Sequence, residues 1–235
     1  MATENLLLAA LPSEVYKRIE NKMEQVELSY GEILNRPGQT IEEVYFPLTC
    51  LISVTITMMD GITVEAGVVG SREMVGINAF MGGQETTQTQ YIVQVPGKAV
   101  KTKAHLLLHE FDTNKSLRDV MLKYTQAYLA QISQNVACNR THTIEKRMAR
   151  WLLESSDRLY SDELFLSHEF LSHMLGVRRS GITETAHILE KKGLIKCGRK
   201  KIKTVDRQGL EEAACECYRV IKEEYDRLLN FKLER

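Results

Sequence analysis

The chain has 235 residues, of which 43% are hydrophobic and 26% charged, and its formal net charge is zero. This composition is ordinary for a globular protein with one or two cores. No apolar run approaches the roughly 20 residues of a membrane-spanning helix, and the N-terminus lacks the basic segment of a secretory signal. We therefore expect a cytoplasmic protein without a membrane partner.

Hydrophobic periodicity changes near residue 26. Residues 1–25 predict a helix capped by Ser13, because Val15, Ile19 and Met23 recur at four-residue steps. From there to about residue 100, apolar and polar residues alternate, and Asp60-Gly61 predicts a two-residue hairpin. Strands are expected near 26–34, 41–47, 52–58, 62–68, 91–95 and 98–102, with a short helix near 76–80. The fold class is α+β, with an antiparallel, jelly-roll-like β-roll as a sensor domain over residues 1–110.

Residues 111–140, after a short helix at 104–111, are predicted to form a long helix with two apolar seams. Such a helix is covered on two sides, so one seam can pack on the β-roll and the other on a second copy in a coiled coil. The alternative is a helix buried within one domain. The spacing does not tell which seam faces a partner. The candidate dimerisation residues are Leu117, Met121, Tyr124 and Tyr128 on one seam and Leu122, Leu129, Ile132 and Val136 on the other.

Residues 141–207 predict a DNA-binding domain. A helix at 142–158 leads to two short helices between Leu166 and Ile195, joined by a turn at Gly176-Val177. Apolar residues at helical spacing can pack these two helices together, as in a helix-turn-helix. Arg178 and Arg179 begin the second helix, where a cation is unfavourable by about 0.3–1 kcal/mol, and a phosphate or guanine would offset that cost. The alternative without DNA binding is an amphipathic helical hairpin whose arginines are solvated.

A basic hairpin follows the second helix. Gly193 ends that helix, and two short strands around Gly198 form a wing with cations at its tip. Residues 176–207 carry 10 Lys+Arg against 3 Asp+Glu, whereas residues 1–110 carry 8 against 13, so positive charge is concentrated here. A C-terminal helix, capped by Asp206, is expected within 208–235. The candidate DNA-binding residues are Arg178, Arg179, Ser180, Thr183, Glu184, His187, Arg199, Lys200 and Lys201.

Cysteine and histidine spacing predicts neither a metal site nor an enzyme. The five cysteines are odd in number and scattered without a C-x-x-C pair, so we expect buried, idle thiols and no metal ligands. Cys215 and Cys217 would point to different sides of a continuous helix. His105, His109 and His142 lie outside the predicted strands, which argues against a metal-dependent β-barrel enzyme.

The order of parts resembles the Crp/Fnr family of bacterial transcription regulators over nearly the whole chain. The strongest match is Leu166–Val205, through the turn Leu175-Gly-Val-Arg-Arg179 and Leu194-Ile195 at the wing. The resemblance implies a cyclic-nucleotide-binding-like β-roll, a dimerisation helix and a winged helix-turn-helix that binds double-stranded DNA, with RNA polymerase as a further partner. It places Arg179, Ser180 and Glu184 at base-contacting positions. The family often has Ser or Thr at the helix cap and Arg later, so this DNA site differs from that of the cyclic-AMP receptor protein.

The sensor segment departs from the family pattern. The resemblance places an effector pocket around Gly76, Ile77, Asn78, Thr86 and Thr87. Ile77 stands where the family has a ribose-binding Glu, and Thr86 where it has a phosphate-binding Arg. A buried cyclic phosphate requires a bidentate cation, so the effector is not expected to be cyclic AMP, and no cofactor is predicted. The chain also lacks the N-terminal cysteine set of the oxygen-sensing members.

These observations predict a homodimeric, DNA-binding transcription regulator, controlled by an unidentified ligand or by a partner. The alternative is a ligand sensor or scaffold that acts through protein partners. Binding of genomic DNA fragments at two salt concentrations distinguishes the two hypotheses.

Overall fold

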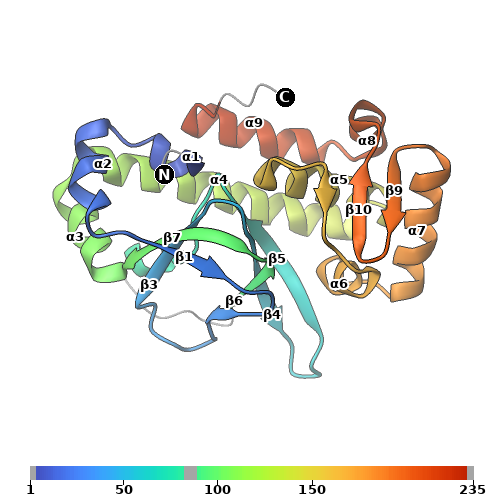
Figure 1. The fold of residues 1–235 in the computed structure, drawn as a ribbon, viewed down its shortest axis with the longest axis horizontal. Helices are drawn as coiled ribbons and strands as arrows, with labels where there is room; N and C mark the ends of the chain where they lie inside the picture. Colours follow the sequence, from blue (N-terminus) through green and yellow to red (C-terminus); the bar gives the residue numbers. More distant parts are fainter. Residues whose placement is uncertain (1–3, 82–88, 232–235) are drawn as a thin grey trace.

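The computed structural model describes residues 4–81 and 89–231. Its N-terminal half is built around an antiparallel β-roll (Figure 1). One sheet has the order β1-β7-β3 and the other β2-β6-β4-β5. The predicted fold class is therefore confirmed. The strands are β1 Glu24–Leu28, β2 Ile33–Asn35, β3 Glu43–Pro47, β4 Leu51–Thr57, β5 Thr63–Val69, β6 Thr89–Val95 and β7 Gly97–Lys103, and a 3-10 helix, η2, covers Ile77–Phe80.

Three local predictions in this half were wrong. Where a single helix was predicted over residues 1–25, the described part of that range holds two short helices, α1 Leu6–Ala9 and α2 Ser13–Glu20. Ser13 is the first residue of α2 and makes no side-chain cap. The strand expected over 26–34 is two strands, because Gly31 turns the chain at φ +79°. The hairpin at Asp60 has a longer turn, in which Gly61 N–H bonds to Met58 O and Met58 N–H to Ile62 O.

The long helix is present as α4, Lys115–Thr141, preceded by α3, Ala104–Thr113. Asn114 caps it, since its Oδ1 accepts the N–H groups of Ser116 and Leu117 at 3.0 and 3.2 Å. The two seams of α4 differ in burial, because one is covered by the core and the other has exposed apolar residues. Leu117, Met121 and Tyr124 are 0% exposed within the core of their own chain, so they cannot contact a partner, and their assignment to dimerisation was wrong.

The C-terminal half is a winged helix-turn-helix followed by two helices (Figure 1). β8 pairs with β10, which gives the wing a third strand that the sequence analysis missed. The last helix was predicted as one but is two, because Ala214 is extended at ψ 165°. The elements are α5 Ile144–Leu159, β8 Glu163–Leu164, α6 His168–Met174, α7 Arg179–Lys191, β9 Ile195–Gly198, β10 Lys201–Thr204, α8 Arg207–Ala213 and α9 Cys217–Leu229.

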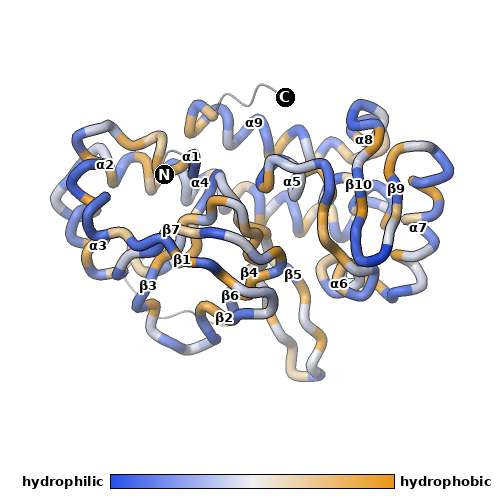
Figure 2. Tube along the Cα trace, in the orientation of Figure 1, coloured by the Kyte–Doolittle hydropathy of each residue, from blue (hydrophilic) through white to orange (hydrophobic). Residues whose placement is uncertain are grey.

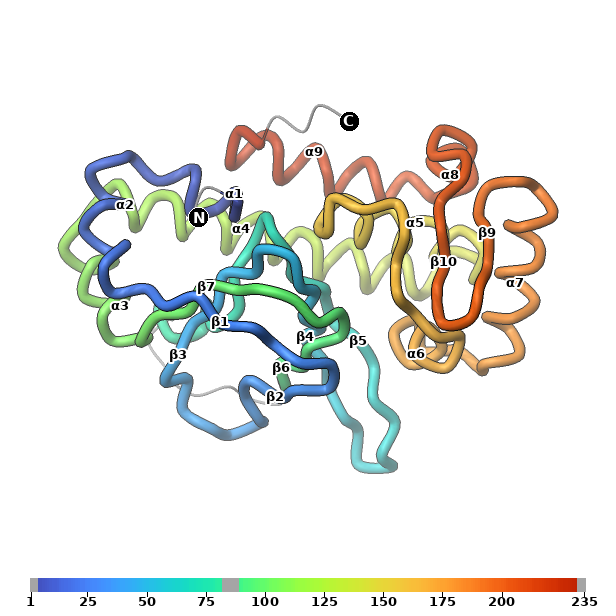
Figure 3. The backbone as a smooth tube through the Cα atoms, in the orientation of Figure 1, coloured from blue at the N-terminus to red at the C-terminus, as the bar shows by residue number. Residues whose placement is uncertain are grey.

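A shared core joins the β-roll to the winged helix-turn-helix. Leu51, Val68 and Val95 from the strands belong to the same buried cluster as Trp151 of α5 and Leu171 of α6. The tube in Figure 3 shows α9 running back over the β-roll and α4. Within the described ranges, no helix is long and apolar enough to cross a membrane.

Buried charges form a second connection between the halves. Arg158 of α5, 1% exposed, contacts Glu73 of the β-roll, 0% exposed, at 2.8 Å. Arg158 also donates to Gln131 of α4 at 3.1 Å, and Gln131 accepts the hydroxyl of Tyr225 of α9 at 2.8 Å. Burying charge is unfavourable unless it is paired and hydrogen-bonded, so this arrangement depends on all of its members.

Three of the five cysteines converge, although they are far apart in the sequence. Cys138 lies near the end of α4, and Cys215 and Cys217 lie at the link between α8 and α9. Because Cys215 lies outside α9 and Cys217 is its first residue, the two are not on one continuous helix, and their thiols can face the same side. The expectation of scattered cysteines therefore holds only for Cys50 and Cys197.

Candidate nucleic-acid interface

The helix α7 is held on α6 by its apolar stripe and ends at a glycine. Ile182, Ala186 and Leu189 are at most 1% exposed and pack in the core with Leu171 of α6. At the C-terminus, Gly193 has φ +75°, and the N–H groups of Gly193 and Leu194 bond to the carbonyls of Glu190 and Leu189. This Schellman arrangement fixes where the wing begins.

The opposite face of α7 is free of protein contacts that would bury it. All six residues predicted there are exposed: Arg178, Arg179, Ser180, Thr183, Glu184 and His187. Arg178 occupies the N-cap without a side-chain cap bond, and the first turn holds no acidic residue. The first backbone N–H groups of a helix lack intrahelical acceptors, so this end offers donors and positive potential to an anion.

Thr183 differs from its neighbours because its hydroxyl already has partners. Its Oγ1 donates to the carbonyl of Arg179 at 3.1 Å and lies 3.1 Å from Nδ1 of His168 on α6. The side chain therefore offers mainly its methyl group to a ligand. His168 was not predicted as a site residue, and only the packing of α6 on α7 brings it here.

The wing presents an exposed lysine face beside α7. Its strands alternate, with Ile195 and Ile202 inward and Lys196 and Lys203 outward and cross-strand paired. The last two were missed, although the period-two pattern of residues 195–204 marks them. Figure 2 shows the loop between β9 and β10 as strongly hydrophilic.

The predicted tip residues of the wing are not equivalent. Arg199 and Lys200 are exposed, and Lys200 adopts a left-handed φ of +56° that turns the chain. Lys201 is exposed but pairs with Glu163 of β8 at 3.2 Å. Lys201 is therefore partly neutralised by the strand that the sequence analysis missed.

The predicted effector pocket corresponds to a cavity of about 340 Å³ between the β-roll and α4. Gly76, Ile77 and Asn78 line it, whereas Thr86 and Thr87 lie outside the described residues. Apolar side chains dominate the lining, and polar groups come from residues such as Asn78 and Tyr91, whose hydroxyl donates to Asn78 Oδ1 at 3.3 Å. None of the described lining residues is charged.

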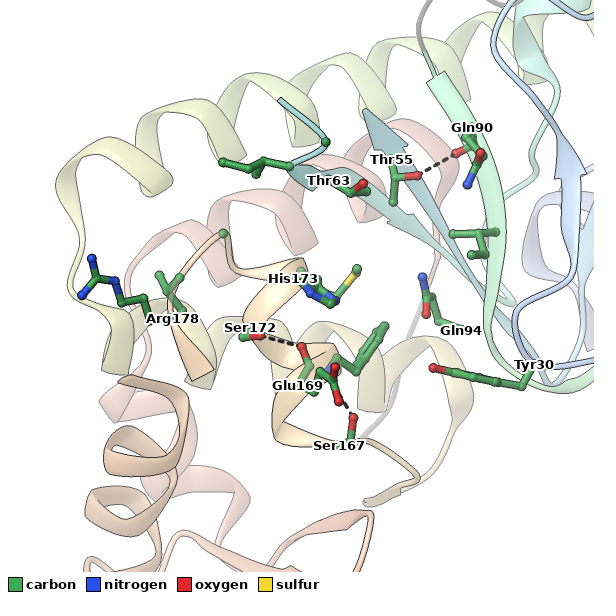
Figure 4. A pocket seen from close by; sticks show the side chains of 17 residues that line it. Tyr30, Thr55, Thr63, Gln90, Gln94, Ser167, Glu169, Ser172, His173 and Arg178 are labelled. Carbon is green, nitrogen blue, oxygen red and sulfur yellow. Dashed lines mark hydrogen bonds between the residues drawn. The ribbon is translucent and has the colours of Figure 1, made fainter. Parts of the chain in front are cut away.

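A second cleft, of about 940 Å³, separates the β-roll from α6. Figure 4 shows Thr55, Gln90 and Gln94 on the strand side and Glu169 and His173 on the helix side. This cleft was not predictable from local patterns, because its walls come from segments more than 70 residues apart in the chain. It lies between the domains, and Arg178 at the N-cap of α7 is one of its lining residues.

Comparisons with known proteins agree with this architecture. Residues 146–213 match the model of the Crp-like helix-turn-helix domain. A search of curated proteins finds no significant match. Among solved structures, FixK2 from Bradyrhizobium japonicum is similar with a TM-score of 0.71 and 16% identity, over 82% of this chain and 98% of that chain.

Two further structures have the same fold. The regulator CLP of Xanthomonas campestris, described as c-di-GMP-responsive, is similar with a TM-score of 0.66 and 16% identity, over 82% of this chain and 99% of that one. A CRP/FNR-family transcriptional regulator from Thermus thermophilus has a TM-score of 0.65 and 21% identity, over 81% and 98%. The chain therefore contains a Crp-like helix-turn-helix domain within the fold of a Crp/Fnr-type regulator.

Proposed function

We propose that the protein is a homodimeric transcription regulator that reads DNA with α7 in the major groove. The observation that carries this proposal is the exposed face of α7, on which Arg178 and Arg179 flank an uncapped helix N-terminus. Arg179 would read a guanine edge, and Glu184 would accept from a cytosine amine. Arg199 and Lys200 on the wing would hold phosphates and set the register.

The free seam of α4 supports the dimer. Leu122, Leu129 and Val136 recur at seven-residue steps and are 53, 55 and 67% exposed. Thr125 and Ile132 lie between them at the complementary heptad positions. A sustained heptad of exposed apolar residues is typical of a two-stranded coiled coil, and a two-fold dimer would present two α7 helices to a pseudo-palindromic site.

We also propose that the β-roll cavity takes an uncharged or largely apolar effector. Thr125, Leu129 and Ile132 line this cavity and belong to the proposed dimer seam. A bound ligand would therefore contact residues at the proposed subunit interface, and it could change dimer stability or geometry directly. The absence of charge on the described lining argues against a cyclic nucleotide there.

The proposed DNA-binding mode is tested by titrating the protein with a duplex selected from random DNA and with a random duplex. Arg179→Ala should weaken specific binding by about 1–3 kcal/mol, roughly 5- to 150-fold, with little change on random DNA. Lys200→Ala should weaken both and lower the salt slope by about one. Arg219→Ala, an exposed arginine of α9, is the matched control. Equal losses on both duplexes for Arg179→Ala would contradict base reading by this residue.

A further inference from the structure

Four potential metal ligands meet where α4, α5 and the C-terminal helices join. Cys138, His142, Cys215 and Cys217 each place a ligand atom within 4.8 Å of all the others. The three cysteines are at most 4% exposed, and His142 is half-buried in the short link between α4 and α5. None of the three forms a disulfide.

Two distances between ligand atoms match those expected around one tetrahedral ion, and the others are at most 4.8 Å. Sγ of Cys138 lies 3.5 Å from Sγ of Cys215, and Sγ of Cys217 lies 3.5 Å from Nδ1 of His142. With zinc–sulfur and zinc–nitrogen bonds of about 2.3 and 2.0 Å, tetrahedral ligands lie roughly 3.5–3.8 Å apart. An iron–sulfur cluster with several irons would spread its ligands more widely than this group.

The surroundings of the four ligands also suit a metal. Nε2 of His142 faces the carboxylate of Glu216 at 3.3 Å, which leaves Nδ1 directed at the thiols. Metal-binding histidines commonly donate their other ring nitrogen to a carboxylate in this way. Gln134 donates its amide to Sγ of Cys217 at 3.2 Å, a contact that stabilises a thiolate.

We propose that Cys138, His142, Cys215 and Cys217 bind one Zn²⁺ ion. Four protein ligands leave no open position, so the ion is structural rather than catalytic. Because His142 lies in the link between α4 and α5, the ion fixes the direction in which α5 leaves α4. It also ties that link to the start of α9. The metal would thus hold the DNA-binding domain at a set angle to the dimerisation helix.

Metal analysis of the purified full-length protein tests this site. The expected result is one equivalent of zinc per chain, which Cys217→Ser loses and the matched control Cys197→Ser, a wing thiol outside the group, retains. Replacement by Co²⁺ should give the visible absorption of a tetrahedral cobalt–thiolate site in wild type and control but not in Cys217→Ser. Far-ultraviolet circular dichroism checks that each variant is folded.

Thiol labelling of the wild-type protein keeps the test decisive if Cys217→Ser does not fold. In the native zinc form, labelling should spare Cys138, Cys215 and Cys217, and chelation should make all three reactive while zinc is released. Protein prepared in zinc-containing medium that carries no zinc would overturn the proposal. So would zinc retained in folded Cys217→Ser, a Cys138–Cys215 disulfide in place of the metal, or the absorption of an iron–sulfur cluster.

Discussion

Replacing Glu73 by Gln should strongly destabilise the protein while leaving its size and shape unchanged. The Glu73 carboxylate receives Arg158 Nε at 3.0 and 3.1 Å and the backbone N–H of Gly70 at 2.6 Å. Both charged side chains are almost completely buried. The neutral amide leaves the Arg158 charge without its main partner.

The contacts of Arg158 set the expected loss in the free energy of unfolding. Breaking a buried ion pair on one side costs about 3–5 kcal/mol. Glu154 remains 3.4 Å from Arg158 as a second carboxylate, so we expect the lower end, about 3 kcal/mol. In a chain of this length each kcal/mol lowers the melting temperature by about 2–4 °C, which gives a drop of about 6–12 °C in a thermal melt.

Two companion variants isolate the cause. Glu223→Gln removes a carboxylate from an exposed pair with Arg219 at 3.9 Å and should change stability by less than about 1 kcal/mol. Glu73→Leu combined with Arg158→Met removes both charges and should be less destabilised than Glu73→Gln alone. A melting temperature for Glu73→Gln within 2 °C of wild type, at about 0.5–1 kcal/mol, would refute this account of the buried pair.

Three further outcomes are expected. Leu129→Glu should shift the protein from dimer to monomer in sedimentation analysis, whereas Val220→Glu, an exposed residue on α9, should not. Asp206→Ala removes the acceptor of the Gly209 N–H at 2.9 Å and should cost about 1 kcal/mol in urea unfolding. Burial raises the pKa of Glu65 above its ordinary value of 4.5, so the folded state retains this proton where the unfolded chain has lost it. The free energy of unfolding should therefore fall as pH rises from 4.5, and Glu65→Gln should flatten that slope in denaturation curves at several pH values.

Local patterns predicted the elements that depend on neighbouring residues. The stripe on α7, the glycine at its end and the alternating strands follow from side-chain geometry within a few positions, and the structure confirms them. The two seams of α4 have the same spacing, so only the completed fold could show that Leu117 is covered and Leu122 is not.

Features that depend on distant contacts were not predictable in the same way. Two residues of β8 are too few for a pattern, yet they pair with β10 and neutralise Lys201. The cysteines were assessed by their spacing along the chain, but the break between α8 and α9 and the path of α4 decide which thiols meet. The cleft beside α6 likewise exists only because separate domains face each other.

The core shared by Leu51, Trp151 and Leu171 limits how this protein can be dissected or recombined. A fragment that starts at α5 would expose a hydrophobic surface to water. It would therefore tend to aggregate instead of acting as an isolated DNA-binding domain. A chimera with the sensor domain of another regulator would need residues that complement this shared core, including a carboxylate for Arg158. The shared core therefore limits which sensor and DNA-binding domains can be combined.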